Sequence, residues 1–283
     1  MGIMRKYYKN ILFIVVVLSS CLEDYDLTGF IRSTDRIEDR YKMSMEWNEL
    51  NPFKIIKVTS EDYKFLVTSD IHVGETIHYQ KFIQRGIKND IETMVFVGDF
   101  VSGKEKDYET FHRLLPEYET KPRFLLTGNH ELFFDGWKHF QRLYGTSVYY
   151  FTVVTPSVKD LYICLDSGSG TLGESQLAWL KNLLEEKRNQ YDQCVIFTHV
   201  NFFRNQHTLS TNPLINELLV LLDLFEKHQV NMVIMGHDHK QAVNQLGNTT
   251  YLTLDALHDQ RRYTTFLILK KNISGITYQF IPV

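Results

Sequence analysis

The chain has 283 residues, 43% of them hydrophobic and 23% charged, which is enough to bury the core of one large α/β domain or two small ones. A net charge of −3 does not indicate a strongly basic, nucleic-acid-seeking protein. Beyond the N-terminal segment only Cys164 and Cys194 remain, both in apolar runs typical of buried strands, so we expect two buried free thiols rather than a disulfide scaffold.

The N-terminal segment differs from the rest of the chain. Arg5, Lys6 and Lys9 precede the unbroken apolar run 11–18, which is too short for a bilayer span of roughly 20 residues. This arrangement predicts the hydrophobic part of a secretory signal. The next residues, Leu-Ser-Ser-Cys ending at Cys21, resemble a bacterial lipoprotein signal, which implies cleavage before Cys21 and a lipid on that cysteine. A plain secretory signal or an uncleaved membrane anchor are the alternatives.

We therefore expect a signal peptide over residues 1–20, a tether and an N-terminal helix over 21–50, and the main domain over 51–283. Removal of residues 1–20 takes away three positive charges and lowers the net charge from −3 to −6. The tether begins with acidic residues, so anionic lipid would repel it and it would stay in solvent. The protein is expected outside the cytoplasm, in the bacterial cell envelope, anchored to a membrane at Cys21 or else secreted in soluble form.

Beyond the tether, residues 34–48 predict a helix that packs on the outside of the domain and ends by Asn51-Pro52. The predicted strands that follow are 64–68, 93–97, 123–127, 148–154, 161–165, 193–198, 232–235, 250–254, 263–270 and 276–281. The predicted helices among them are 79–89, 107–115, 136–143, 174–188 and 214–228. Alternating β and α segments with a strand-rich end indicate an α/β fold with layered sheets.

Most chemically useful side chains follow directly after an apolar strand. In five strand-end loops these side chains are Asp70 and His72, Asp99, Asn129 and His130, His199, and His237 and His239. Ligand sites of open α/β sheets lie beyond the carboxyl ends of the strands, so the five loops are expected to converge. Carboxylates, an amide oxygen and imidazoles without a thiolate suit Mn, Fe or Zn ions. Without His130, which lies beside Asn129, the two carboxylates, one amide oxygen and four imidazoles make seven ligands, which are too many for one ion but suit two ions that share a ligand.

Each motif alone has a plainer interpretation. Asp70 and Asp99 could cap a turn or a helix, and His237 and His239 could be polar residues of a surface turn. The combination of all five segments is what favours a metal site. The remaining six histidines have no such context, and surface or packing roles are expected for His78, His112, His139, His207, His228 and His258.

The five segments read SDIHVG (69–74), VGDFVSG (97–103), TGNHELF (127–133), FTHVN (197–201) and MGHDHK (235–240). In this order they closely resemble the calcineurin-like metallophosphoesterase superfamily, over residues 62–242. The resemblance implies an α/β fold built as a four-layer α/β/β/α sandwich of two mixed β-sheets flanked by helices. It also implies a phosphoester hydrolase, either a phosphatase or a phosphodiesterase, with two divalent or trivalent metal ions and a metal-bridging hydroxide that attacks phosphorus.

The resemblance assigns a role to each residue of the pattern. It places Asp70, His72 and His239 on the first metal, Asn129, His199 and His237 on the second, and Asp99 between both. His130 is not a ligand in the family; it would contact the phosphoryl group and protonate the leaving oxygen. Asp238 has no ligand role and is expected to face away. Glycines 98, 128 and 236 are expected to allow sharp turns close to the metals.

Departures from the family pattern narrow the class. Protein Ser/Thr phosphatases carry G-D-x-x-D-R-G, whereas FVSG follows Asp99 here, so neither the aspartate that pairs with the catalytic histidine nor the phosphate-binding arginine is present. Purple acid phosphatases use D-x-G and a tyrosine where this chain has His72 and Ser102, so a tyrosinate-bound ferric ion is not expected.

No large insertion separates the motifs, so short loops should set the specificity, chiefly 75–80, 102–108, 135–138 and 201–213. Arg204 in the last loop could contact a second phosphate, although a solvated surface arginine is the simpler interpretation. The expected partner is a small phosphoester, without nucleic acid. A non-catalytic binding module on the same fold, or a nuclease, are the alternative functions.

Overall fold

The computed structural model describes residues 35–52, 54–204 and 211–283, whose strands form two sheets packed face to face. The larger sheet has, in spatial order, β1 (Ile55–Lys57), β5 (Tyr149–Val154), β6 (Lys159–Leu165), β7 (Cys194–Thr198), β8 (Met232–Met235), β10 (Thr249–Thr253) and β9 (Ala242–Leu246). The smaller sheet has β12 (Gly275–Pro282), β11 (Thr265–Asn272), β2 (Tyr63–Thr68), β3 (Thr93–Val97) and β4 (Arg123–Leu126). Both sheets are mixed, because each combines parallel neighbours with antiparallel ones. The predicted signal peptide and Cys21 lie outside the described residues.

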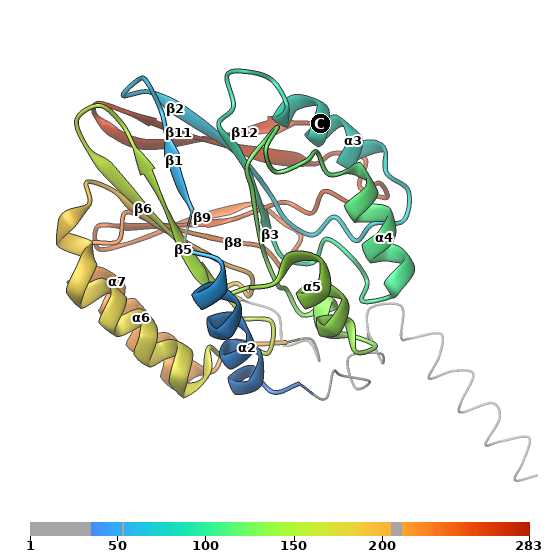
Figure 1. The fold of residues 1–283 in the computed structure, drawn as a ribbon, viewed down its shortest axis with the longest axis horizontal. Coiled ribbons are helices and arrows are strands. Elements are labelled where there is room, and N and C mark those ends of the chain that lie inside the picture. The colour runs from blue at the N-terminus through green and yellow to red at the C-terminus, as the bar shows by residue number, and fades with distance from the viewer. Residues whose placement is uncertain (1–34, 53, 205–210) are drawn as a thin grey trace, which may run out of the picture.

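Helices cover the outer face of each sheet (Figure 1). On the smaller sheet lie α3 (Ile77–Gly86), α4 (Glu105–Leu114) and α5 (Gly136–Tyr144), and on the larger sheet lie α6 (Gly173–Lys187) and α7 (Ile215–Lys227). The expected four-layer sandwich of two mixed sheets flanked by helices is therefore confirmed. None of the described helices combines the length and the apolar composition that a membrane crossing requires.

The alternation of side chains along each strand produces the layers. In β2, Phe65 and Val67 point between the two sheets, whereas Leu66 belongs to the apolar cluster under α3 and α4. Between the sheets, the rings of Phe124 and Phe151 stack with their centroids 3.6 Å apart. Burial of strand residues on both faces explains why the strands read as short continuous apolar runs in the sequence.

The predicted elements agree with the observed ones except at their ends and for two strands. The predicted strands 93–97 and 232–235 match β3 and β8 at both ends, and both expected thiols are free and buried. The sequence does not predict β1 or β9. Each lies at an edge of the larger sheet, where β9 is mostly exposed and β1 has only three residues, so neither needs a recognisable apolar pattern.

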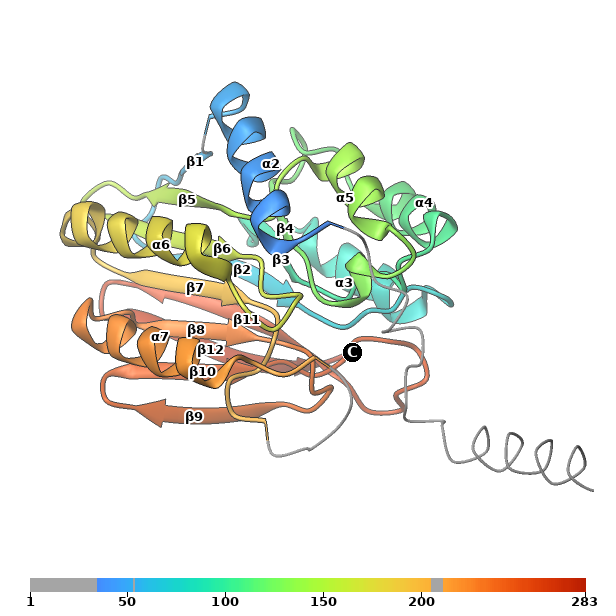
Figure 2. The same cartoon turned by 90° about the horizontal axis from the view of Figure 1, so that it is seen from below.

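The first helix, α2 (Ile37–Leu50), lies outside the sheets as expected but turns a polar face to the protein. Arg40, Ser44 and Asn48, four residues apart, are its buried residues. Arg40 Nε and Nη2 donate to the carboxylate of Asp166 at 2.8 and 3.2 Å, and Asn48 Nδ2 donates to Val148 O at 2.8 Å. Both views show α2 between α6 and α5 (Figure 2). Polar contacts to the loop after β6 and to the residue before β5 thus hold α2 in place against the domain.

The pair of Arg40 and Asp166 is buried, with side chains 1% and 0% exposed. Removal of one partner leaves an uncompensated buried charge, so we predict that Arg40→Ala lowers the free energy of unfolding by about 3–5 kcal/mol. Lys42 lies on the exposed face of the same helix, and Lys42→Ala should lower that free energy by no more than about 0.5 kcal/mol. Urea unfolding followed by circular dichroism measures both values. Equal losses in the two variants would contradict a structural role for the buried pair.

Candidate metal centre

The eight predicted site residues lie in the loops after β2, β3, β4, β7 and β8. Among the described histidines, cysteines and acidic residues, one group with potential ligand atoms within 4.8 Å of one another consists of Asp70, His72 and His239. A second such group consists of Asp99, His199 and His237. Asp99 also forms a group with His72 and His130, so it lies between the first group and the second, where a bridging ligand would lie.

Five of these residues hold the backbone in the left-handed region, which residues other than glycine adopt at a cost. The angle φ is 52° at Asp70, 43° at His72, 52° at Asp99, 76° at His237 and 55° at His239. Main-chain hydrogen bonds hold two of the loops together, from Asp70 N to Gly98 O at 3.1 Å and from His72 N to Asp99 O at 3.0 Å. Such unusual angles concentrate at functional sites, which supports a site here.

The polar atoms of the first group converge in a way that fits a cation. His72 Nε2 and His239 Nε2 are 3.1 Å apart, and His239 Nε2 lies 3.3 Å from Asp70 Oδ1. Asp70 Oδ1 is buried, and no hydrogen bond reaches it from the described residues. A buried carboxylate oxygen normally has a partner. A metal ion bound by one oxygen and two imidazole nitrogens would supply that partner, so these residues fit the ion.

The second group also contains buried polar atoms that make no hydrogen bond to the described residues. Asn129 Oδ1 and His199 Nε2 are buried, and within the described part of the chain neither makes a hydrogen bond. His199 Nε2 nevertheless lies 3.1 Å from Asp99 Oδ2. The donors available to an ion are again oxygen and imidazole nitrogen, the set that suits Mn, Fe or Zn. Asn129 is the residue before η2 (His130–Leu132), and its side chain makes no capping hydrogen bond to that turn, so the amide oxygen is not engaged there.

Main-chain carbonyl groups fix which ring nitrogen of two histidines is available. His199 Nδ1 lies 2.8 Å from Val97 O, so Nδ1 carries the proton and Nε2 is left to face Asp99. His237 Nε2 lies 2.8 Å from Thr211 O and 2.7 Å from Arg204 Nη1, so these contacts engage Nε2 and Nδ1 is left for the site. Contacts of this kind orient the histidine ligands of metal sites.

Burial and neighbouring charges act differently on the histidines of the site. Burial, together with a neighbouring imidazole, lowers the pKa of His72 and of His237 to about 3, which keeps both in the neutral form that a metal requires. Burial acts in the same direction on His199, but the charge of Asp99 outweighs it and raises the pKa of His199 to about 10. Although burial alone would raise the pKa of Asp99, His199 and His130 hold it well below its usual range. The buried carboxylate therefore stays ionised and needs positive partners.

Glu131 is a site residue to which the sequence pattern assigned no role, although it belongs to the TGNHELF segment. Its carboxylate is fully buried and accepts hydrogen bonds from the main-chain N–H groups of Asp99 at 2.7 Å, Gly128 at 2.6 Å and Val101 at 3.1 Å. Burial and the charge of Asp99 raise the pKa of Glu131, and the N–H groups of Gly128 and Val101 counter that rise. Glu131 thus ties the loop after β3 to the loop after β4.

The three motif glycines serve two different purposes. Only Gly98 has a positive φ, at 76°, and so matches the expected sharp turn. At Gly128 an added Cβ would lie 2.1 Å from Asp99 Oδ1, and at Gly236 it would lie 1.9 Å from Ser69 Oγ. Space beside the ligands, rather than backbone freedom, therefore requires glycine at 128 and 236.

Asp238 turns toward the loop after β7. Its carboxylate lies 2.9 Å from Arg204 Nε and accepts a hydrogen bond from Asn201 Nδ2 at 2.8 Å. Asp238 belongs to none of the ligand groups found among the described residues, in line with its expected lack of a ligand role. The interpretation of Arg204 as a solvated surface residue is wrong, because its side chain is 6% exposed and also donates to Thr211 O.

A cavity of about 450 Å³ opens beside the first group. Its lining consists of His72, Gly74, Glu75, Ser102, His130, His239, His258, Asp259 and Gln260. The ring of His258, for which the sequence predicts a surface or packing role, lies 6.1 Å from that of His72 and 5.6 Å from that of His239, so His258 lies beside the first group. The expected specificity loops include Glu75 and Ser102 but not the loop between β10 and β11, which brings His258 to the site.

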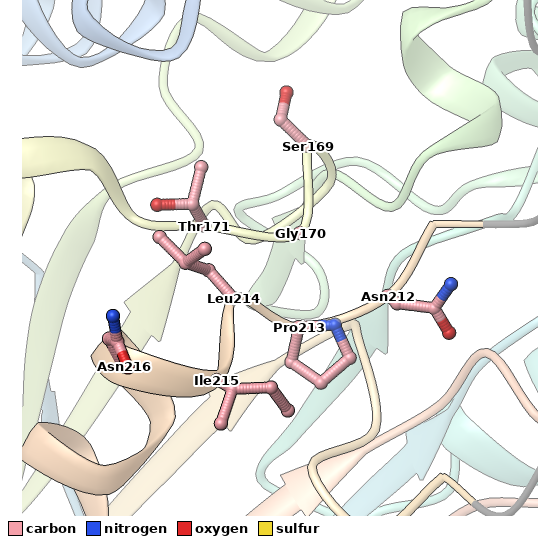
Figure 3. Close-up of a pocket in the computed structure, with 8 residues that line it drawn as sticks. All are labelled: Ser169, Gly170, Thr171, Asn212, Pro213, Leu214, Ile215 and Asn216. Atoms are coloured by element: carbon pink, nitrogen blue, oxygen red, sulfur yellow. The ribbon is translucent and has the colours of Figure 1, made fainter.

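A second cavity, of about 410 Å³, lies between residues 169–171 and residues 212–216 (Figure 3). None of the eight predicted site residues lines it, and the described residues of its lining include no charged side chain. The chemistry therefore belongs to the cavity beside the first group. His207, in the last predicted specificity loop, lies outside the described residues.

The sequence profile of the calcineurin-like phosphoesterase family matches residues 63–241. No curated protein gives a sequence match. Among solved structures, the GAP50 anchor of the inner membrane complex of Plasmodium is similar, with a TM-score of 0.62, 14% identity and coverage of 78% of this chain and 84% of that one. A dimetal phosphatase from Danio rerio is similar with a TM-score of 0.60, 12% identity and coverage of 77% and 95%. At these identities the likeness shows the fold.

Glu131→Gln keeps the shape of the side chain but replaces one oxygen, which accepts from main-chain N–H groups, by an NH₂ group that can only donate. We predict a loss of about 1–3 kcal/mol of unfolding free energy and a metal affinity lower by about tenfold or more. Metal content after dialysis and urea unfolding measure the two effects. Glu109→Gln, at an exposed position of α4, is the matched control and should change neither. An unchanged metal content in Glu131→Gln would show that Glu131 does not position the ligands.

Proposed function

Because the chain belongs to the calcineurin-like phosphoesterase family, we propose that it hydrolyses small phosphate mono- or diesters with the help of two metal ions. The observation that carries the proposal is the pair of ligand groups, one around Asp70 and one around His199, with Asp99 between them. The backbone angles, the buried oxygens without hydrogen bonds and the carbonyl-oriented imidazoles support the same conclusion.

In the proposed site each ion has its own ligands and one that is shared. Asp70, His72 and His239 would hold the first ion, Asn129, His199 and His237 the second, and Asp99 both. When bound, two such ions supply positive charge for the phosphoryl oxygens and lower the pKa of a water molecule that can act as the nucleophile. The set of oxygen and nitrogen donors suits Mn, Fe or Zn.

His130 is the proposed acid. Its Nε2 lies 4.0 Å from Asp99 Oδ2, and its ring packs 4.4 Å from the ring of His72 and 4.6 Å from that of Phe133. These contacts limit the orientations of the imidazole. Because His130 lines the cavity beside the first group, it can reach a bound phosphoester. There it would donate a hydrogen bond to the phosphoryl group and a proton to the leaving oxygen.

Two variants separate the ligand role from the acid role. Asp99→Asn removes the charge of the shared ligand, so it should lose metal from both positions. His130→Ala should keep its metal while kcat falls by about 10²-fold or more. Metal content per chain and turnover of generic mono- and diesters by the Mn²⁺-loaded protein measure these effects. Equal metal loss in both variants would contradict the separate roles, and a wild-type protein that leaves every ester intact would contradict the proposed activity.

We also propose that the chain is exported and held at the bacterial cell envelope by a lipid on Cys21. The positive residues, the apolar run 11–18 and the Leu-Ser-Ser-Cys sequence support this location. An exported site would act on phosphoesters outside the cytoplasm.

Cys21→Ser should abolish metabolic labelling with a radioactive fatty acid, because the acceptor thiol is gone. It should also move the protein from the membrane fraction to the soluble fraction or leave it uncleaved. Cys164→Ser, at a buried thiol, is the control and should keep the label. Labelling that survives in Cys21→Ser would exclude this anchor.

A further inference from the structure

The cavity beside the first group indicates on which side of the site the leaving group of the proposed reaction would lie. This inference rests on the proposed function. His130, His72 and His239 line this cavity, whereas His199 and His237 do not. His130 is the proposed proton donor to the leaving oxygen. An ester oxygen within reach of His130 therefore places the group bonded to it in this cavity. The volume of about 450 Å³ is ample for a small organic group.

The wall of the cavity is held in place by an aspartate. Asp259 Oδ2 accepts a hydrogen bond from Ile77 N at 2.9 Å, and Asp259 Oδ1 accepts one from His78 N at 2.7 Å. Both donors belong to the first turn of α3, whose N–H groups have no partner within the helix. The loop between β10 and β11 is thus fixed to α3, and His258 is held against the rings of His72 and His239.

The described lining carries negative but no permanent positive side chains. Glu75 and Asp259 supply two carboxylates, and no lysine or arginine is among the described lining residues. Glu75 is an exposed residue of the lining, whereas the oxygens of Asp259 accept hydrogen bonds from the first turn of α3. Three basic residues of the flanking loops, Arg261, Lys104 and Arg262, are not among the described residues that line the cavity, and Arg262 Cζ lies 5.3 Å from the ring centre of Tyr263. Arg261 Nη2 donates to His239 O, and Lys104 Nζ lies 5.8 Å from the ring centre of Phe134.

We propose that this cavity is the leaving-group subsite and that it takes a polar leaving group without negative charge, such as a polyol or an amino alcohol. Hydroxyl or amino groups find hydrogen-bond partners in the imidazole of His258, the hydroxyl of Ser102 and the amide of Gln260. A leaving group with a carboxylate or a further phosphate meets the carboxylate of Glu75, and no arginine or lysine is among the described residues that line the cavity. Nucleotides with several phosphates and nucleic acid are disfavoured for the same reason.

The test compares two esters of similar size that differ in one carboxylate, glycerol 3-phosphate and 3-phosphoglycerate, each as the monoester and as its methyl diester. The protein is the mature chain loaded with Mn²⁺, and the product measured is glycerol or glycerate. The carboxylate of Glu75 should repel the carboxylate of the glycerate esters, so their kcat/KM should be about tenfold lower than that of the glycerol esters. Glu75→Lys should reduce this ratio to about twofold or less.

Glu186→Lys is the matched control, because Glu186 is exposed on α6, on the opposite side of the molecule from α3 (Figure 1). It makes the same change in net charge and should keep the ratio of the wild type. Equal kcat/KM for both leaving groups, or the same ratio in Glu75→Lys and Glu186→Lys, would overturn the inference while hydrolysis itself stands. Failure to hydrolyse these esters or any generic phosphoester would overturn the proposed function and this inference with it.

Discussion

Two buried carboxylates, those of Asp70 and Asp99, are the constraint on which the site depends. Both are almost completely shielded from solvent, and an ionised carboxylate in that position costs several kcal/mol unless it is matched by partners. Main-chain N–H groups supply part of the match, from His237 to Asp70 Oδ2 at 2.9 Å and from His130 to Asp99 Oδ1 at 2.8 Å. These donors come from other loops, so each carboxylate also links the loops that follow two different strands.

The chemistry of the site was predictable from the sequence because it is encoded locally. Each motif follows an apolar strand, and the parallel strands of one sheet bring their carboxyl ends to one edge, which places Asp70 beside Asn129. His199 follows a strand of the other sheet, and the packing of the two sheets brings it to the same place. The layered fold was predictable for a similar reason, since strands buried on both faces read as continuous apolar runs. The edge strands β1 and β9 escaped prediction because they bury little.

Other features depend on contacts between distant residues and leave no local pattern. Arg40 pairs with Asp166 across 126 positions, so the sequence shows only a charged helix and not its buried face. His258 looked isolated because nothing near it in the chain resembles a motif. It reaches the site because β10 lies beside β8 in the larger sheet, which sets the following loop against His239. Glu131 belongs to a recognisable motif, but its three N–H partners come from two loops.

The surroundings of the two ligand groups are unequal, and this inequality decides how a substrate enters. At the second group, Thr211 and Arg204 contact His237, and Asp238 fixes Arg204 in turn, so protein atoms occupy that flank. At the first group, the cavity lined by His258 is open. In the proposed reaction, a phosphoester would extend on the first side, where the described residues leave a cavity. Specificity then depends on the loop between β10 and β11, while the strand-end motifs supply the reaction.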